Sequence, residues 1–294
     1  MRVLITGASG FIGRRLVARL SGRHEVLAVV RERQKPAPVA PVFEVVVDLA
    51  QQLNAKLLPP AVDVIIHLAQ ANVLFPDFAN ELFAVNTSAT QRLLDYARGS
   101  GARQFILAST GDVYGRRLGL SKETDAVRPA NYYAATKHSA ELLAQAYFGF
   151  LQVCILRLYQ PYGPDQSDRL IPRLADRIRR HEAVRLNEDA RPHMTPIYID
   201  DVTRAIELAM DCSFSGMLNV AGDCVVTVRE LAVEIGRVLE IEPIFEATGE
   251  QCSDFMGDNN LMRTVLGDWS MVALKDGLSR TLKGEGAIAW QVDV

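Results

Sequence analysis

The chain has 294 residues, of which 49% are hydrophobic and 23% are charged, and its formal net charge at pH 7 is −3. A globular chain of this length and composition buries enough apolar surface to fold without disulfides or a structural metal. Proteins that bind nucleic acids or anionic membranes usually carry a basic surface, which this slightly acidic balance does not suggest. We therefore expect no nucleic-acid partner and no membrane partner.

The four cysteines are expected to be reduced thiols, because they form no Cys-x-x-Cys pair and no histidine stands at a zinc-finger spacing. They are Cys154, Cys212, Cys224 and Cys252. We expect no metal site. The sequence shows neither an apolar run of about 20 residues nor an N-terminal signal, which predicts a cytoplasmic protein. Residues 284–294 leave open whether the end of the chain is disordered or docked.

Short apolar, β-branched runs alternate with helical patterns through the first half of the sequence. We expect parallel strands over residues 2–6, 26–30, 43–48, 64–68, 104–109 and 153–159. Helices are expected over residues 11–20, 86–98 and 131–148. This alternation predicts a doubly wound α/β fold, the Rossmann type, whose ligands bind beyond the carboxyl ends of the strands.

The regular alternation ends at Gly163-Pro164, which predicts a boundary near residue 163. We expect residues 1–163 to form the dinucleotide-binding domain and residues 164–294 a smaller α/β substrate-binding lobe. Segments around residues 192–211 are expected to pack back on the first domain. A basic, amphipathic stretch covers residues 170–181, and two further helices are predicted over residues 200–211 and 228–239.

The first predicted strand runs into a Gly-x-x-Gly-x-x-Gly turn formed by Gly7, Gly10 and Gly13. Glycine permits the tight turn, leaves room for a pyrophosphate at the helix N-terminus and lets helix and strand pack closely. A purely structural βα turn is the alternative. The position of the turn in the first βα unit favours a dinucleotide site. Its other expected contacts are Ser9, Phe11 and Ile12.

The second predicted strand ends in Val30-Arg31-Glu32-Arg33, where an adenine ribose is usually contacted. Arginines here suit the 2′-phosphate of NADP, whereas Glu32 suits the free 2′-hydroxyl of NAD, and we favour NADP. A solvated loop without ligand is the alternative for Arg31 and Arg33. Asp48 and Leu49, after the third strand, are expected to line the adenine pocket, although Asp48 could equally cap a turn.

Tyr133 is followed four residues later by Lys137 near the start of a predicted helix, so both side chains project from one face. A phenol is a poor base at neutral pH, but a neighbouring ammonium and a positive nicotinamide ring favour the phenolate. The strand before this helix ends in Ser109 and Thr110, whose hydroxyls are placed to bind a substrate oxygen. The glycine loop, this strand end and the tyrosine helix are expected to converge.

With these motifs the sequence resembles the extended short-chain dehydrogenase/reductases, the family of nucleotide-sugar epimerases and dehydratases. The likeness spans residues 1 to about 283. It is carried by Gly7–Gly13, His67-Leu68-Ala69, Ser109–Gly115, Tyr133–Lys137, Arg157–Pro164 and Pro196-Ile197-Tyr198-Ile199-Asp200-Asp201.

The resemblance implies a role for each matching residue. Thr110 and Tyr133 would be catalytic, Tyr133 as the acid/base, and Lys137 would be catalytic and also hold the nicotinamide ribose. Further cofactor contacts would be Leu68, Ala69, Asn86, Ser109 and Tyr159, with a helix N-cap as the alternative for Asn86 and strand packing for Tyr159. The implied substrate contacts are Thr110, Asp112, Gln160, Arg173, Arg191 and Tyr198.

Two positions depart from the family pattern. Dehydratases carry an Asp-Glu pair after the threonine, where this chain has Gly111-Asp112, which argues against dehydration. An arginine that grips the nucleotide diphosphate is replaced by Met194. Arg173 or Arg191 could substitute for it, and a surface cation is the alternative for both.

These residues predict an NAD(P)-dependent nucleotide-sugar epimerase or 4-ketoreductase that transfers hydride at a sugar carbon. The alternatives are an NADPH-dependent reductase of a non-sugar ketone, a nucleotide-sugar dehydratase and a non-catalytic dinucleotide-binding module. By the family resemblance, the helices around residues 86–98 and 131–148 would form a homodimer interface. Their apolar positions could instead be used within one subunit.

Overall fold

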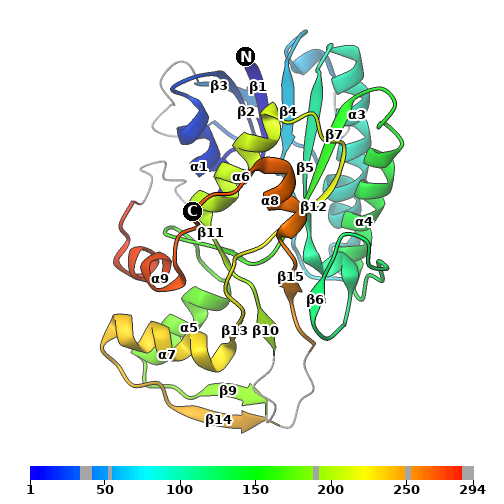
Figure 1. The fold of residues 1–294 in the computed structure, drawn as a ribbon. Coiled ribbons are helices and arrows are strands. Elements are labelled where there is room, and N and C mark those ends of the chain that lie inside the picture. The colour runs from blue at the N-terminus through cyan, green and yellow to red at the C-terminus, as the bar shows by residue number, and fades with distance from the viewer. Residues whose placement is uncertain (34–41, 52–54, 188–191, 249–252, 287–294) are drawn as a thin grey trace.

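The computed structural model describes residues 1–33, 42–51, 55–187, 192–248 and 253–286 (Figure 1). Arg191, Cys252 and residues 287–294 lie outside these ranges, so the predictions that concern them fall outside the described residues. In this part of the chain, one large parallel sheet stands above a smaller lobe (Figure 1).

The large sheet has seven strands in the order β12-β7-β5-β4-β1-β2-β3, all parallel. The strands are β1 (Arg2–Thr6), β2 (Glu25–Val30), β3 (Val42–Val46), β4 (Val64–His67), β5 (Gln104–Thr110), β7 (Gln152–Leu158) and β12 (Gly216–Val220). Strand order reverses direction between β1 and β4, where crevices form in doubly wound sheets. The predicted fold class is confirmed. Only β12 lacks a counterpart among the predicted strands, since its short run contains Asn219 in place of an apolar residue.

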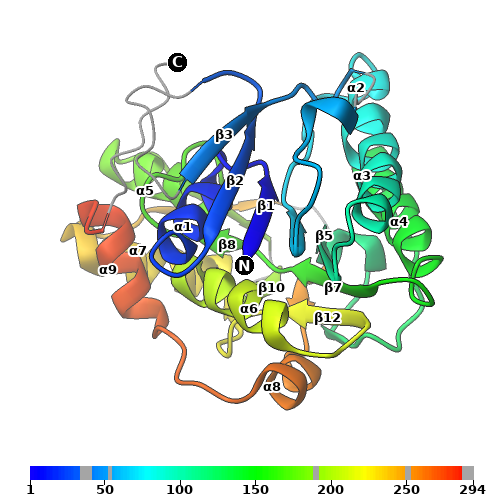
Figure 2. The same ribbon diagram turned by 90° about the horizontal axis from the view of Figure 1, so that it is seen from above.

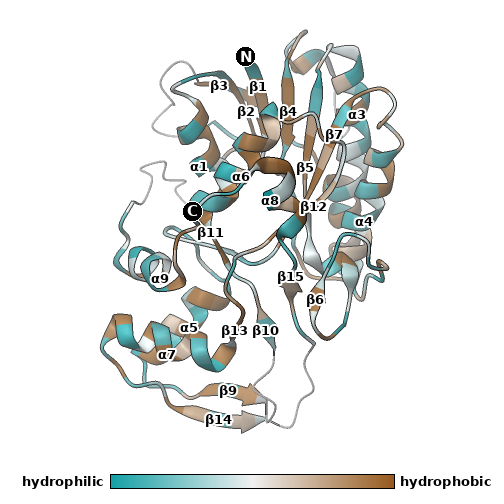
Figure 3. Ribbon diagram, viewed as in Figure 1, coloured by the Kyte–Doolittle hydropathy of each residue, from teal (hydrophilic) through white to brown (hydrophobic). Residues whose placement is uncertain are grey.

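Helices cover both faces of this sheet (Figure 2). One face packs against α1 (Phe11–Leu20), α6 (Ile199–Asp211) and α8 (Asn260–Leu266). The other packs against α3 (Ala89–Gly99) and α4 (Tyr132–Gln145). The predicted helix over residues 86–98 is preceded by α2 (Ala79–Phe83) and the π-helical segment η2 (Ala84–Ser88). Because both faces are covered, the strands are apolar along their length, as Figure 3 shows for β1, β4 and β5.

The smaller lobe has its own apolar core, formed mainly by α5 (Leu170–Arg179), α7 (Val228–Leu239) and α9 (Leu274–Lys283). Two strand pairs complete it, β9 (Val184–Asn187) with β14 (Phe245–Thr248) and β10 (His193–Met194) with β13 (Val226–Thr227). Helix α7 begins at a capping box in which Thr227 and Glu230 each bond the other's backbone N–H.

Short elements connect the two parts. Strand β8 (Pro161–Tyr162) pairs with β11 (Ile197–Tyr198), and β6 (Leu120–Ser121) pairs with β15 (Met256–Gly257). The 3₁₀ turns are η1 (Ala55–Leu57) and η3 (Gly111–Tyr114). After the small-lobe segment 170–194, the chain returns to the large sheet as α6 and β12. Within the described ranges, no helix has both the length and the apolarity needed to cross a membrane.

Candidate active site

The glycine turn brings the N-terminus of α1 close to the loop after β4. Gly7 has φ +68°, and a Cβ there would lie 2.7 Å from the Ala69 backbone nitrogen. A Cβ on Gly13 would collide with the Gly7 carbonyl oxygen. Helix α1 starts after Gly10, whose N-cap position carries no side-chain hydrogen bond. The first N–H groups of the helix therefore lack a side-chain cap, which suits a bound phosphate.

A cavity of about 1130 Å³ begins at this turn and runs along the carboxyl ends of the strands. Most of the predicted site residues line it, from both halves of the chain. They are Gly7, Ser9, Gly10, Phe11, Ile12, Gly13, Arg31, Asp48, Leu49, Leu68, Ala69, Ser109, Thr110, Asp112, Tyr133 and Gln160. The structure thus brings together the glycine loop, the end of β5 and the start of α4, as the sequence predicts.

Thr110 and Tyr133 face this cavity from β5 and α4. The Thr110 hydroxyl donates to Asp112 Oδ2 at 3.1 Å and accepts from the Asp112 backbone N–H at 3.2 Å, which caps η3. The Tyr133 hydroxyl donates to Gln70 Oε1 at 2.7 Å. Helix α4 is fixed at its start by Asn131, whose side chain accepts from the Ala134 N–H at 2.8 Å.

The ionisable groups near Tyr133 set its protonation. Burial raises the pKa of the Tyr133 phenol, the nearby Asp112 carboxylate raises it further, and the Arg169 guanidinium lowers it. Burial also raises the pKa of Asp112 and lowers the pKa of Lys137 to about 8. The phenol is therefore protonated at neutral pH in the free protein.

Lys137 is buried between α4 and the end of β5. Its side chain is 1% exposed, and its ammonium donates to the Ala108 carbonyl oxygen at 2.6 Å. Arg169, rather than Lys137, is the cation that lowers the pKa of Tyr133. Lys137 thus secures α4 to the end of β5 in this structure.

Several predicted residues lie outside the lining of the cavity, judged over the described part of the chain. Asn86 is fully buried and neither contacts the cavity nor caps a helix: its amide bonds the N–H and C=O of Ala71 and the hydroxyl of Thr136. Tyr159 is 1% exposed and packs on Phe255. Tyr198 is 3% exposed and packs edge-on against Tyr162. Both tyrosines fill apolar cores, because their rings are enclosed on every side.

The predicted arginines are divided among three places. Arg31 lines the large cavity, and Arg33 is exposed beyond it. Arg173 lines a second cavity of about 460 Å³ and forms an exposed ion pair with Asp168 at 3.1 Å. Arg191 lies outside the described residues.

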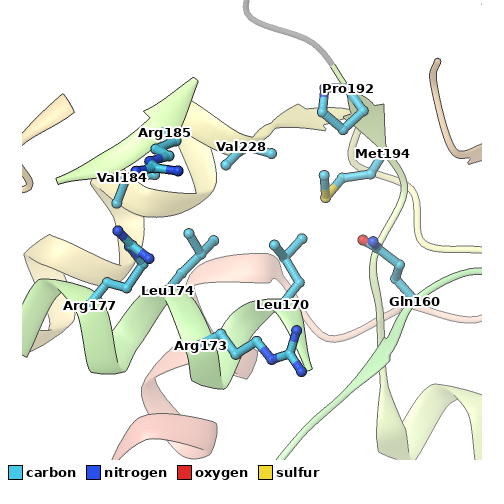
Figure 4. A pocket seen from close by; sticks show the side chains of 10 residues that line it. All are labelled: Gln160, Leu170, Arg173, Leu174, Arg177, Val184, Arg185, Pro192, Met194 and Val228. Carbon is cyan, nitrogen blue, oxygen red and sulfur yellow. The ribbon is translucent and has the colours of Figure 1, made fainter. Parts of the chain in front are cut away.

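The second cavity adjoins the first, because Gln160 and Leu170 line both. Its three arginines are Arg173 and Arg177 of α5 and Arg185 of β9. They lie among apolar side chains (Figure 4). The apolar residues are Leu170, Leu174, Val184, Pro192, Met194 and Val228. Met194, the position where the family pattern has an arginine, therefore forms part of the apolar wall.

Gln70, Asn72 and Arg169 are among the polar residues of the large cavity that sequence reasoning missed. With the Asn72 amide oxygen turned toward the guanidinium, it accepts from Arg169 Nη1 at 2.8 Å and Nη2 at 3.1 Å. Arg169 stands just before α5, and Gln70 and Asn72 follow β4. The only signal for Gln70 and Asn72 in the sequence was their place directly after the His67-Leu68-Ala69 motif.

Comparison with known proteins agrees with this geometry. The model of the NAD dependent epimerase/dehydratase family matches residues 3–221. A protein of Bacillus subtilis (strain 168) named Uncharacterized UDP-glucose epimerase YtcB is 28% identical over 309 residues, covering 96% of this chain and 97% of that protein. The dTDP-glucose 4,6-dehydratase of Streptomyces griseus is 29% identical over 313 residues, with 95% and 92% covered.

Solved structures show the same fold with a dinucleotide present. MoeE5 in complex with UDP-glucuronic acid and NAD has a TM-score of 0.85 and 29% identity, covering 97% of this chain and 98% of that chain. DesIV, a dTDP-glucose 4,6-dehydratase from Streptomyces venezuelae with NAD and TYD bound, has a TM-score of 0.82 and 26% identity, with 97% and 96% covered. The chain belongs to the NAD dependent epimerase/dehydratase family and is an enzyme of that family.

Proposed function

We propose that this enzyme is a nucleotide-sugar epimerase that uses a nicotinamide dinucleotide and Tyr133 as acid/base. The observation that carries the proposal is the shared cavity. Thr110 and Tyr133 line the same 1130 Å³ space as the glycine turn, so a dinucleotide on the turn and a sugar at Tyr133 fit one continuous site.

The turn fits the pyrophosphate of NAD(P), because the uncapped α1 N-terminus and the Gly10 backbone face the cavity. Arg31 lines the adenine end, and Asp48 uses its Oδ1 to accept from the Ala50 N–H at 2.9 Å. We therefore favour NADP over NAD, although the relatives named above hold NAD. Calorimetric titration with both dinucleotides tests this: tighter binding of NADP supports it, and tighter binding of NAD contradicts it.

When bound, the dinucleotide would supply the hydride acceptor and donor and a positive charge near the phenol. The Tyr133 hydroxyl already donates a hydrogen bond to Gln70 Oε1. A sugar hydroxyl in that position would give its proton to the phenolate, which the positive charge favours, and would take the proton back from the phenol in the reverse step. Thr110 would orient the sugar oxygen from the end of β5. Lys137 would hold α4 on β5 and bind the nicotinamide ribose.

The rest of the substrate fits the arginine-lined second cavity. A nucleoside diphosphate combines a flat apolar base with two anionic phosphates. The second cavity pairs apolar walls with Arg173, Arg177 and Arg185, and Arg169 stands in the large cavity on the way to it. Arg169 thus supplies a cation that Met194 does not.

Dehydration fits the site less well. A Cβ at Gly111 would lie 2.5 Å from two ring carbons of Tyr159, so the buried tyrosine excludes any side chain there. Asp112 is then the single carboxylic acid that η3 presents beside Thr110. Epimerisation needs one acid/base at the sugar hydroxyl, which Tyr133 supplies.

A product assay tests the proposed activity. Purified enzyme is incubated with UDP- and dTDP-hexoses and hexuronic acids, and proton NMR follows the products. We expect the 4-epimer to form without net change in nicotinamide absorbance. Steady loss of that absorbance with a 4-keto sugar nucleotide would identify a ketoreductase instead.

Replacing Tyr133 by Phe is expected to lower kcat by about 10²-fold or more, the usual contribution of a general acid/base. Tyr132→Phe is the matched control, because Tyr132 stacks on Phe75 away from the cavity lining and should keep wild-type kcat. Full activity of Tyr133→Phe would contradict the proposal.

We also propose a homodimer through α3 and α4. Leu143 and Tyr147 pack into the subunit core, whereas Leu142 on the outer face of α4 is 54% exposed. Sedimentation velocity tests this proposal, and a monomer at micromolar concentration would overturn it.

A further inference from the structure

A fully buried polar network lies directly beneath the proposed reacting centre. The Glu141 carboxylate accepts from Arg157 Nε at 2.9 Å and Nη2 at 2.7 Å, and from the Ser109 hydroxyl at 2.5 Å. Arg157 Nη1 donates to the Tyr114 hydroxyl at 2.8 Å, which in turn donates to Asn219 Oδ1 at 3.0 Å. All five side chains are at most 3% exposed.

The network follows one row across three neighbouring strands. Ser109 of β5 is in register with Arg157 of β7, and Arg157 is in register with Asn219 of β12. Asn219 continues the row to the β6 segment, where its amide donates to the Ser121 carbonyl at 2.8 Å. Strand β6 pairs with β15, which directly follows the cavity residues Asp254 and Phe255.

Helix α4 contacts the end of β5 through successive turns. Tyr133, Lys137 and Glu141 are spaced four residues apart and so share one helix face. Lys137 bonds the carbonyl of Ala108, Glu141 bonds the side chain of Ser109, and Tyr133 lines the cavity with Thr110. The position of Tyr133 relative to Thr110 is therefore set by the two turns that follow it.

A buried ion pair is by itself weak evidence for a gain in stability. Burying a carboxylate and a guanidinium costs much of what their attraction returns, and apolar replacements of such pairs are often as stable. A paired, hydrogen-bonded charge does fix geometry, because any shift leaves a buried charge unpaired. Proton transfer requires such fixed geometry, since a displacement of about 1 Å can cost about 10²-fold in rate.

We propose that Glu141, held by Arg157, is a positioning residue that sets the Tyr133 face of α4 against Thr110. The inference rests on the proposed epimerase activity. Neither charge contacts the substrate cavity in the described structure. Their effect is on kcat, with little effect on substrate or dinucleotide affinity.

The test replaces both charges together, as Glu141→Leu/Arg157→Met, so that neither member of the pair is left buried without the other. Relative to wild type, we expect kcat to fall 10- to 100-fold, with KM and the dinucleotide Kd within threefold. The matched control is Glu234→Leu/Arg237→Met, which removes an exposed ion pair of α7 and should leave kcat unchanged. A folded double variant with wild-type kcat would overturn the proposal.

Hydrogen exchange provides a readout that does not depend on turnover. We expect the amides of α4 to exchange at least tenfold faster in the Glu141/Arg157 double variant, while those of α7 keep their rates. Unchanged exchange in α4 would overturn the proposal even if no nucleotide sugar is turned over. If the double variant does not fold, Glu141→Gln takes its place at a temperature where circular dichroism shows it folded. Wild-type kcat and wild-type α4 exchange in Glu141→Gln would also overturn the proposal.

Discussion

His67 shows how a single buried side chain contributes to the pH dependence of stability. The imidazole is 1% exposed, with Nδ1 2.6 Å from the Thr6 hydroxyl and Nε2 3.0 Å from the Thr90 hydroxyl. Burial, followed by the charge of Lys137, lowers the pKa of His67 from 6.5 to about 3. Between about pH 3 and pH 6.5 the folded protein therefore keeps this histidine neutral, whereas the unfolded chain protonates it.

The resulting prediction is a loss of stability on acidification. At pH 5 the unfolded state binds a proton on His67 and the folded state does not, so stability falls as the pH falls. From this group we expect the free energy of unfolding to drop by about 2 kcal/mol between pH 7.5 and pH 5, and to drop further toward pH 3. Urea unfolding of wild type and His67→Asn at both pH values measures it. Equal pH slopes in the two proteins would contradict the prediction.

At the scale of elements, Asn86 joins two segments that carry site residues. Its amide accepts from the Ala71 N–H at 2.8 Å and donates to the Ala71 carbonyl at 3.0 Å and the Thr136 hydroxyl at 3.1 Å. Ala71 follows Gln70 in the loop after β4, and Thr136 precedes Lys137 on α4. The η2 segment thus fixes the loop of Gln70 against the helix of Tyr133.

Asn86→Ala is expected to lower the free energy of unfolding by about 2–6 kcal/mol. The reason is that two backbone groups of buried Ala71 lose their partner, at about 1–3 kcal/mol for each unsatisfied group. Guanidinium unfolding measures the change. Asn80→Ala, on the exposed side of α2, is the control and should change it by about 0.5 kcal/mol at most. A loss for Asn86→Ala no larger than the control's would refute this role.

How far the sequence predicts the site depends on whether the signal is local. The glycine turn and the Tyr133–Lys137 helix were predictable, because one turn and one helical face fix the relative positions of their residues. Other placements depend on segments that are far apart in the sequence and meet only in the folded chain. These are the bond of Lys137 to Ala108, the bonds of Asn86 to Ala71 and the packing of Tyr159 in a core. Gln70, Asn72 and Arg169 were missed for the same reason, since spacing along the chain does not reveal contacts across the cavity.

At the scale of the whole molecule, the large sheet is completed by segments that come after residue 163. Helix α6 and strand β12 follow the small-lobe segment in sequence. Helix α6 nevertheless packs against the large sheet, and β12 is one of its strands. The Trp269 indole N–H donates to the Asp201 carboxylate at 2.9 Å, which ties a still later segment to α6. The division at residue 163 stays a prediction about function. It separates the first strands of the large sheet from α6, β12 and the segment of Trp269, which complete the sheet and its cover.

Residues 1–163 alone are therefore expected not to unfold cooperatively. Removing α6 exposes the sheet surface that buries Val202, Ile206 and Met210, and each such side chain contributes about 1.5–3 kcal/mol on burial. The sum of about 4.5–9 kcal/mol is comparable to the whole stability of a typical domain, about 5–15 kcal/mol. Losing β12 also leaves the edge of β7 unpaired, and an unpaired strand edge promotes aggregation.

Thermal unfolding by circular dichroism and binding of a hydrophobic dye compare the fragment with the full chain. A sharp transition without dye binding in the fragment would show that the first 163 residues fold without the returning segments.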